Sequence, residues 1–92
     1  MTKFILDVTD LASEDLSRLP REIQKRIRDK IDFFLASENP LHYAETLNEF
    51  EAGDYRFKIG HYRASFDVIY TQKTVVLKML KIKHRKDMYT KK

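Results

Sequence analysis

The spacing of hydrophobic residues predicts two helices in the first half of the chain. Over 9–19, apolar residues recur at the helical period behind the capping residue Thr9, and acidic residues fill the first turns, where the helix dipole favours them. Pro20 cannot continue this helix, but it suits the first position of another. Apolar residues then keep the helical period up to "SENP", which predicts a second helix over 20–36.

Alternation of apolar and polar residues predicts strands in the second half. Segments 54–60, 62–70 and 74–83 are the candidates, and the polar link 71–73 joins the last two as a hairpin. The apolar, β-branched run 3–8 is typical of one further strand. The resulting order β-α-α-β-β-β predicts a single α+β domain, in which a two-helix hairpin packs on one face of a four-stranded antiparallel sheet.

The remaining segments indicate no second unit, and one domain is expected to span residues 1–92. The connection 39–54 contains one marginal strand or turn, and the tail after residue 83 is typical of a short turn or helix with a loose end. There is no cysteine, which excludes disulfides, zinc–thiolate sites and thiol nucleophiles. The apolar run at the start is too short for a signal peptide or a membrane span, so we expect a soluble, cytoplasmic protein.

Charge is unevenly distributed along the chain. Residues 1–54 hold 7 Lys and Arg against 12 Asp and Glu, whereas residues 55–92 hold 11 against 2, so the net charge of +4 conceals a strongly basic half. Such a half indicates a polyanionic partner, with nucleic acid favoured over an acidic membrane surface. A solvated lysine surface that serves solubility is the alternative.

Three basic side chains of the strands are predicted to meet on one face. Arg56, Lys58 and Arg63 alternate with apolar or aromatic residues, so they point away from the helices as exposed cations. Neighbouring strands lie about 5 Å apart, and so many like charges are tolerated where a polyanion occupies the site. A plain solvated sheet face is the alternative. The last strand, 74–83, begins apolar on both sides, so its core face is not assigned.

Two segments, "YRFKIGHYRASFDVIY" and "VVLKMLKIKHRKDMY", resemble the RelE/ParE superfamily of bacterial and archaeal toxins. Members typically combine a Tyr-Arg-x-basic-x-Gly-x-Tyr-Arg core with a hydrophobic strand that runs into His-Arg-x-x-x-Tyr. The resemblance covers nearly the whole chain and implies a mostly antiparallel four-stranded sheet with an α-hairpin on one side. This sequence departs from the pattern where "ASFD" replaces two aliphatic residues and a tyrosine, and where Lys83 replaces a common glycine.

The resemblance implies one of two activities. RelE-like members cut mRNA in the ribosomal A site, whereas ParE-like members inhibit DNA gyrase and lack the nuclease residues. A gyrase inhibitor without catalysis, or an RNA- or antitoxin-binding module that has lost the nuclease, is the alternative to an endoribonuclease that inhibits translation. The implied partners are an acidic antitoxin, the ribosome and mRNA. The positions of the nuclease set are filled here, which favours the ribonuclease branch; they are Arg56, Lys58, Arg63, Arg85 and Tyr89.

RNA carries its own nucleophile, the 2′-OH, so such an enzyme is expected to need no metal or cofactor. Lys58 is the candidate base, because its charged form is disfavoured beside Arg56 and Arg63. The two arginines would hold the phosphate. By resemblance, Arg85 lies near the leaving oxygen, and Tyr89 would stack on a base.

Basic residues around the end of the last strand would add RNA contacts. His84 could replace Arg85 as the acid, or it could cap the tail, and Tyr89 could simply pin the C-terminus to the sheet. His61 is assigned to a tight turn without a catalytic role, and His42 has no metal-ligand pattern around it. The phosphate- or RNA-binding candidates are Arg56, Lys78, Lys81, Lys83, His84 and Lys86.

Overall fold

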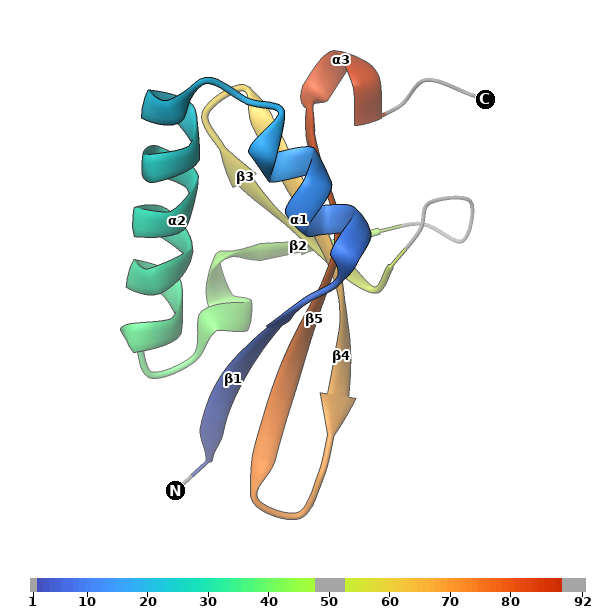
Figure 1. The fold of residues 1–92 in the computed structure, drawn as a ribbon. Helices are drawn as coiled ribbons and strands as arrows, with labels where there is room; N and C mark the ends of the chain where they lie inside the picture. The colour runs from blue at the N-terminus through green and yellow to red at the C-terminus, as the bar shows by residue number, and fades with distance from the viewer. Residues whose placement is uncertain (1, 48–52, 89–92) are drawn as a thin grey trace.

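The computed structural model describes residues 2–47 and 53–88 (Figure 1). Both predicted helices and all four predicted strands are confirmed, with boundaries that agree within two residues. In chain order the elements are β1 (Lys3–Val8), α1 (Asp10–Ser17), α2 (Arg21–Ala36), the 3₁₀ helix η1 (Pro40–Tyr43), β2 (Ala44–Thr46), β3 (Tyr55–Ile59), β4 (Tyr62–Tyr70), β5 (Thr74–His84) and α3 (Arg85–Met88).

The strands form one five-stranded mixed sheet in the order β1-β5-β4-β3-β2. β1 runs parallel to β5, and the other neighbours are antiparallel. The α+β class is as predicted, but the predicted count of four strands is wrong. The fifth strand, β2, lies in the connection where the sequence indicated a marginal strand or turn. It pairs only three residues with β3, which is too short for alternation to identify.

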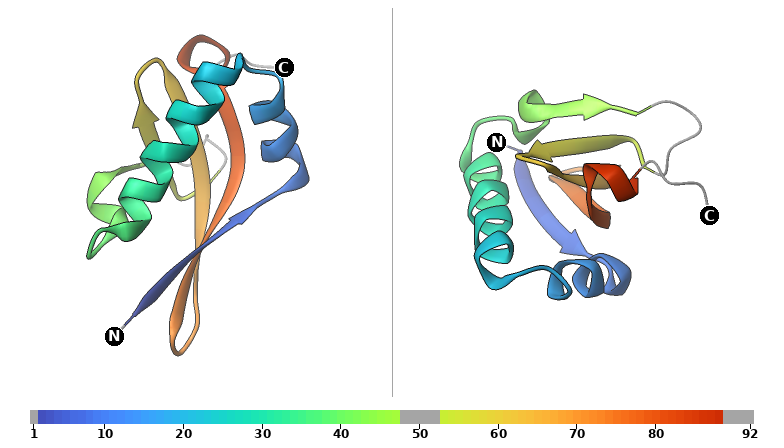
Figure 2. Two further views of the ribbon diagram at one scale, coloured as in Figure 1. Left: turned by 60° about the vertical axis from the view of Figure 1, so that its left-hand side comes forward. Right: turned by 90° about the horizontal axis from the view of Figure 1, so that it is seen from above.

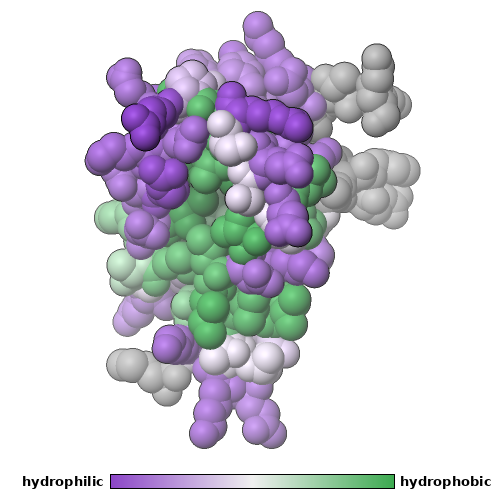
Figure 3. Space-filling model, viewed as in Figure 1, coloured by the Kyte–Doolittle hydropathy of each residue, from purple (hydrophilic) through white to green (hydrophobic). Residues whose placement is uncertain are grey.

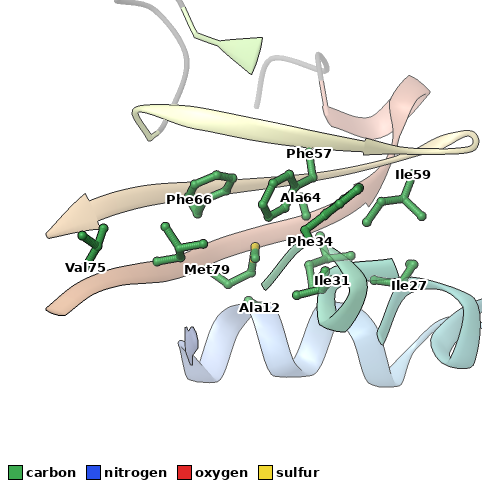
Figure 4. Close-up of a cluster of buried hydrophobic side chains, with 12 residues drawn as sticks. Ala12, Ile27, Ile31, Phe34, Phe57, Ile59, Ala64, Phe66, Val75 and Met79 are labelled. Atoms are coloured by element: carbon green, nitrogen blue, oxygen red, sulfur yellow. The ribbon is translucent and has the colours of Figure 1, made fainter. Parts of the chain in front are cut away.

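The helices α1 and α2 contribute side chains to one core with the sheet (Figures 2 and 4). The Thr9 hydroxyl accepts a hydrogen bond from Ala12 N at 3.1 Å, which caps α1 as the sequence indicates. Phe34 of α2 packs on Phe57 of β3, which in turn packs on Phe66 of β4, each pair with ring centroids 4.6 Å apart. These aromatic contacts fix α2 to the sheet. Among the described helices, none is long and apolar enough to cross a membrane.

A β-bulge in β5 determines which of its side chains face the core. Phe66 pairs with Met79, whereas the preceding residue of β4 pairs with Lys81. Leu80 is therefore an extra residue on β5, and the alternation of buried side chains shifts by one position after it. As a result, all three lysines of β5 lie on the face of the sheet away from the core; they are Lys78, Lys81 and Lys83.

The chain just before β3 is fastened against this bulge. Gly53 has a φ of +101°, and a Cβ there would lie 3.1 Å from Phe66 O and 3.3 Å from Leu80 Cδ1. Asp54 continues the contact, because its N–H donates to Phe66 O at 3.0 Å and its carboxylate accepts from Val68 N at 3.0 Å. Glycine suits position 53 on both counts, since it has no side chain and adopts positive φ without strain.

Candidate nucleic-acid interface

The face of the sheet away from the core carries the cations that the sequence singles out. The register places Lys58 opposite Arg63, and Arg63 opposite Lys83, in one row across β3, β4 and β5. Opposite residues of neighbouring strands lie about 5 Å apart, so this row brings three cations together. A second row follows two residues further along the strands. The two rows form what we call the basic face, which consists of Arg56, Lys58, Arg63, Ser65, Lys81 and Lys83.

Arg63 is not the exposed cation that the sequence predicts. Only 9% of its surface is accessible, and its Nη1 donates to the carbonyl oxygens of Gly60 and Tyr62, both at 2.9 Å. The guanidinium group is thus folded against the turn between β3 and β4. Its Nε–H is buried and has no hydrogen-bond partner among the described residues. Arg63 is therefore held in place by the turn while one donor stays unused.

The basic face is bordered by an acidic residue that the sequence analysis did not identify. Glu45 of β2 lies opposite Arg56, accepts a hydrogen bond from Arg56 Nε at 3.0 Å, and lies 3.5 Å from Lys58 Nζ. The hydrogen bond from Arg56, helped by the charge of Lys58, lowers the pKa of Glu45 below its ordinary value. The sequence places only Arg56 and Arg63 beside Lys58, whereas the structure adds the carboxylate of Glu45.

Lys83 is held by a buried carboxylate from the first helix. Asp15 of α1 is 3% exposed, and its Oδ1 lies 2.9 Å from Lys83 Nζ. Its Oδ2 accepts the N–H of Ile82 at 3.0 Å, beyond the last pairing of β5 with β1 at Met79. From the sequence, the acidic residues of this helix are expected only to favour its dipole, and this role of Asp15 is not predicted. The available signal was that Asp15 falls on the same helical stripe as the apolar residues.

Lys78 lies on the same side of the sheet but outside the basic face. Its neighbours in the register are acidic on both sides, with Asp7 on β1 and Asp67 on β4. Carboxylates opposite a lysine offset its charge locally. This position makes Lys78 a weaker candidate for RNA contact than the two lysines after the bulge.

His84 lies on the helix side of the sheet. It pairs with Tyr62 in the register, and its ring centroid lies 5.2 Å from that of Tyr62 and 5.9 Å from that of His61. The three rings line a pocket of about 80 Å³ whose other wall is α2. His84 Nδ1 accepts the Lys86 N–H at 3.1 Å. This bond is the cap of the tail that the sequence left open as one alternative.

The helix α3 begins with two exposed cations, Arg85 and Lys86. The Arg85 N–H donates to His61 O at 2.7 Å, which ties α3 to the turn between β3 and β4. Gly60, with φ of +60°, forms this turn with His61. Tyr89 lies outside the described residues, so its stacking on a base stays a prediction.

Comparison with known families decides the relationship that these segments suggest. Residues 6–89 match the model of a family described as ParE toxin of type II toxin–antitoxin system, parDE. The chain belongs to this toxin family. The match confirms the resemblance to the RelE/ParE superfamily that the sequence analysis identifies. No curated protein sequence matches.

Two solved structures are similar to this ParE-family toxin along nearly its whole length. One is the RelBE2 toxin–antitoxin complex of Mycobacterium tuberculosis, with 28% identity and a TM-score of 0.69; the alignment covers 92% of this chain and 94% of that chain. The other is the RelB–RelE antitoxin–toxin complex of Methanococcus jannaschii, with 21% identity and a TM-score of 0.58, over 90% of this chain and 94% of that chain. The second similarity concerns the fold alone.

The basic face of this ParE-family toxin can bind and neutralise a polyanion. Arginine and lysine side chains from three adjacent strands supply only donors and positive charge, and Glu45 at the border competes for two of them. Within residues 2–47 and 53–88, no three His, Asp or Glu side chains are grouped so that they could hold a metal ion. The arginine and lysine side chains of the face can supply charge stabilisation and hydrogen bonds.

The lowered pKa of Glu45 predicts a specific dependence of stability on pH. A depressed carboxyl pKa stabilises the fold fully above the ordinary value of 4.5, and this contribution is lost as pH falls through the lowered value of the folded protein. Glu45→Gln should therefore reduce the unfolding temperature slightly at pH 7, and the difference from the unmodified protein should vanish in acid. Thermal unfolding between pH 7 and pH 3 measures this.

The exposed Glu38 is the matched control, because the structure gives its carboxyl no ion pair with any residue it describes. Glu38→Gln should leave the unfolding temperature unchanged across the same pH range. A difference between Glu45→Gln and the unmodified protein that persisted undiminished at pH 3 would show that the carboxylate charge is not the cause.

Proposed function

We propose that this toxin is a metal-independent endoribonuclease that cuts mRNA in the ribosomal A site, with the basic face as its RNA site. The observation that carries the proposal is the row of Lys58, Arg63 and Lys83 across three adjacent strands. Like charges in register repel one another, and a phosphate backbone offsets that repulsion. The 28% identity to a chain of the RelBE2 complex supports the same branch of the superfamily.

The proposed chemistry uses the 2′-OH of RNA as the nucleophile. Lys58, whose side chain is 52% exposed, would take the 2′-OH proton, and Arg63 would stabilise the charge that builds up on the phosphate. Lys58 Nζ lies 3.5 Å from Glu45 Oε2, so the base role requires this ion pair to break when RNA enters the face. Arg85, at the start of α3, would lie near the oxygen that leaves the phosphate. Tyr89 would stack on a base of the RNA.

Inhibition of DNA gyrase without catalysis is the second candidate, and the family description itself favours it, since it names ParE. A cell-free translation reaction with primer extension on a reporter mRNA, run beside a gyrase supercoiling assay, separates the two. New cuts in the mRNA with unchanged supercoiling are expected. Inhibited supercoiling without cuts would replace the nuclease by the gyrase inhibitor, and neither effect would indicate a binding module that has lost activity.

We also propose an acidic antitoxin as the partner of this toxin. Both similar structures are complexes of a toxin with an antitoxin, and the basic half of the chain needs an anionic cover. Figure 3 shows, in addition, an apolar region in the middle of the molecule as seen in Figure 1, and Val8 and Leu11, at β1 and α1, are 40% and 57% exposed. A partner with acidic and apolar segments would suit both surfaces.

Binding of such a partner should be tight, in the nanomolar class, and should weaken steeply as salt is raised, because exposed charges are screened. Isothermal titration at two salt concentrations against the product encoded beside the toxin measures this. Cleavage should stop when the complex forms. Tight, salt-independent binding that left mRNA cleavage unchanged would show that the partner does not cover the basic face.

A further inference from the structure

Two buried polar groups at the centre of the basic face have no hydrogen-bond partner. They are the Nε–H of Arg63 and the hydroxyl of Ser65, and neither finds an acceptor or donor among the described residues. Arg63 is 9% and Ser65 is 2% exposed. Most buried polar groups in folded proteins are paired, because an unpaired one retains the full cost of its lost hydration. Two such groups side by side therefore call for a ligand.

The register places both groups on the same side of β4, two residues apart. Ser65 lies between Arg56 on β3 and Lys81 on β5. Its side chain is the shortest in this row, and the side chains on either side of it are cationic. Ser65 and Arg63 are thus neighbouring hydrogen-bond donors on β4. All other side chains of the two rows are positively charged.

The β-bulge occurs at this same point. The register shift falls between Ser65 and Phe66, opposite the extra residue Leu80. If β5 were paired without the bulge, Leu80 would lie opposite Ser65, Lys81 would turn to the core side, and the row of Ser65 would lose its cation from β5. Bulges are frequent beside functional sites, where they redirect side chains. The bulge and the unpaired Ser65 hydroxyl thus lie at the same point of β4, two residues from Arg63.

We propose that the Ser65 hydroxyl and the Arg63 Nε–H are the two hydrogen-bond donors that receive a phosphate group of the RNA on the basic face. This inference rests on the proposed function and adds Ser65 as a binding residue. Phosphate oxygens accept hydrogen bonds and donate none, so both unused donors are satisfied at once. The surrounding lysines and Arg56 supply charge, whereas the hydroxyl supplies a directional hydrogen bond. Lys81 is long and flexible enough to move aside when the phosphate enters.

Ser65→Ala tests the inference, because it removes the hydroxyl and leaves every charge in place. The unmodified protein and the variant are heated with and without inorganic phosphate, at constant ionic strength set with chloride. Without phosphate, Ser65→Ala should unfold at the same or a higher temperature, since an unpaired buried hydroxyl contributes no stability. Affinity for phosphate, from the dependence of unfolding temperature on its concentration, should fall about 10-fold, as for a lost hydrogen bond to a charged acceptor.

Two further comparisons separate the effect of the hydroxyl from changes in packing. Ser65→Thr and Ser65→Val differ only in the hydroxyl, so Thr should retain more phosphate stabilisation than Val even if both pack less well. Ser13→Ala, at an exposed position of α1, should change nothing. Equal phosphate stabilisation of the unmodified protein and Ser65→Ala, or of Thr and Val, would overturn the inference.

Cleavage of a reporter mRNA separates this inference from the proposed function. If the unmodified toxin cuts the mRNA and Ser65→Ala loses phosphate affinity, the nuclease function and the role of Ser65 are both supported. If the unmodified toxin cuts while Ser65→Ala binds phosphate equally well, the inference fails and the nuclease stands. If phosphate binding depends on the hydroxyl but no mRNA is cut, the anion site stands while the nuclease function fails.

Discussion

Replacement of Arg63 by alanine is expected to lower cleavage of a reporter mRNA by about 10²–10³-fold, the range found when a preorganised charge-stabilising group is removed. The reason is that the guanidinium is held rigidly, by bonds to Gly60 O and Tyr62 O, at the centre of a row of cations. A group that acts mainly on the transition state changes turnover far more than binding. Ribosome affinity should therefore change little, because the remaining lysines still supply long-range attraction.

Arg63→Ala also removes two partly buried hydrogen bonds to the turn between β3 and β4, so a loss of about 1–3 kcal/mol in unfolding free energy should accompany it. Cleavage must be measured where circular dichroism shows the variant to be folded. Lys73→Ala, in the link between β4 and β5, is the control and should be silent in cleavage, binding and stability. If folded Arg63→Ala cuts as well as Lys73→Ala, the basic face is only a solvated surface and the nuclease proposal is wrong.

Asp15→Ala is expected to cause a larger loss of stability than any exposed ion pair of this protein could. The buried carboxylate meets Lys83 Nζ at 2.9 Å and the Ile82 N–H at 3.0 Å. Its removal leaves both donors without their acceptor. Breaking a buried ion pair costs about 3–5 kcal/mol, and the lower end applies here because a third of the Lys83 side chain, 34%, remains in water. Urea unfolding measures the difference.

The chain provides a matched control for this prediction. Asp29 of α2 lies 2.9 Å from Lys25 Nζ, the same separation as in the buried pair, but the two side chains are 63% and 74% exposed. Asp29→Ala should cost at most about 0.5 kcal/mol, as is usual for an exposed pair on a helix. Equal losses for Asp15→Ala and Asp29→Ala would show that burial does not set the strength of the Asp15 contact.

Most of the fold could be predicted from sequence because its helices and long strands carry clear periodicity. The limits appear where a single residue breaks the period. Leu80 shifts the alternation of β5 by one, so that an apolar run with lysines on both apparent faces becomes, in the sheet, a strand with all its lysines on one face. Periodicity assumes an unbroken pleat and cannot locate such an insertion. The short β2 could be indicated only as a marginal strand or turn, because three residues are too few for alternation to show.

The membership of the basic face could also be predicted in part, since alternation alone places Arg56, Lys58 and Arg63 together. The residues that surround these three cations could not be predicted. Glu45 and Asp15 reach the face from elements distant in the sequence, and only the register and the path of α1 reveal them. The burial of Arg63 depends on a turn whose carbonyls face inward. Sequence thus predicts which charges share a face, whereas their partners depend on tertiary structure.

The parallel pairing of β1 with β5 has a consequence for the folding of the toxin during its synthesis. β5 is the last of the five strands to be synthesised, yet it lies between β1 and β4, and its first residue, Thr74, pairs with Lys3. Contacts between such distant residues form late in folding, and ribosomes add only about 5–20 residues per second. The nascent chain therefore lacks Lys81, Lys83 and an internal strand of its sheet until residues 74–84 have emerged. The basic face is therefore incomplete during the synthesis of most of the chain. The ribosome that makes the toxin meets a complete basic face only after β5 has emerged.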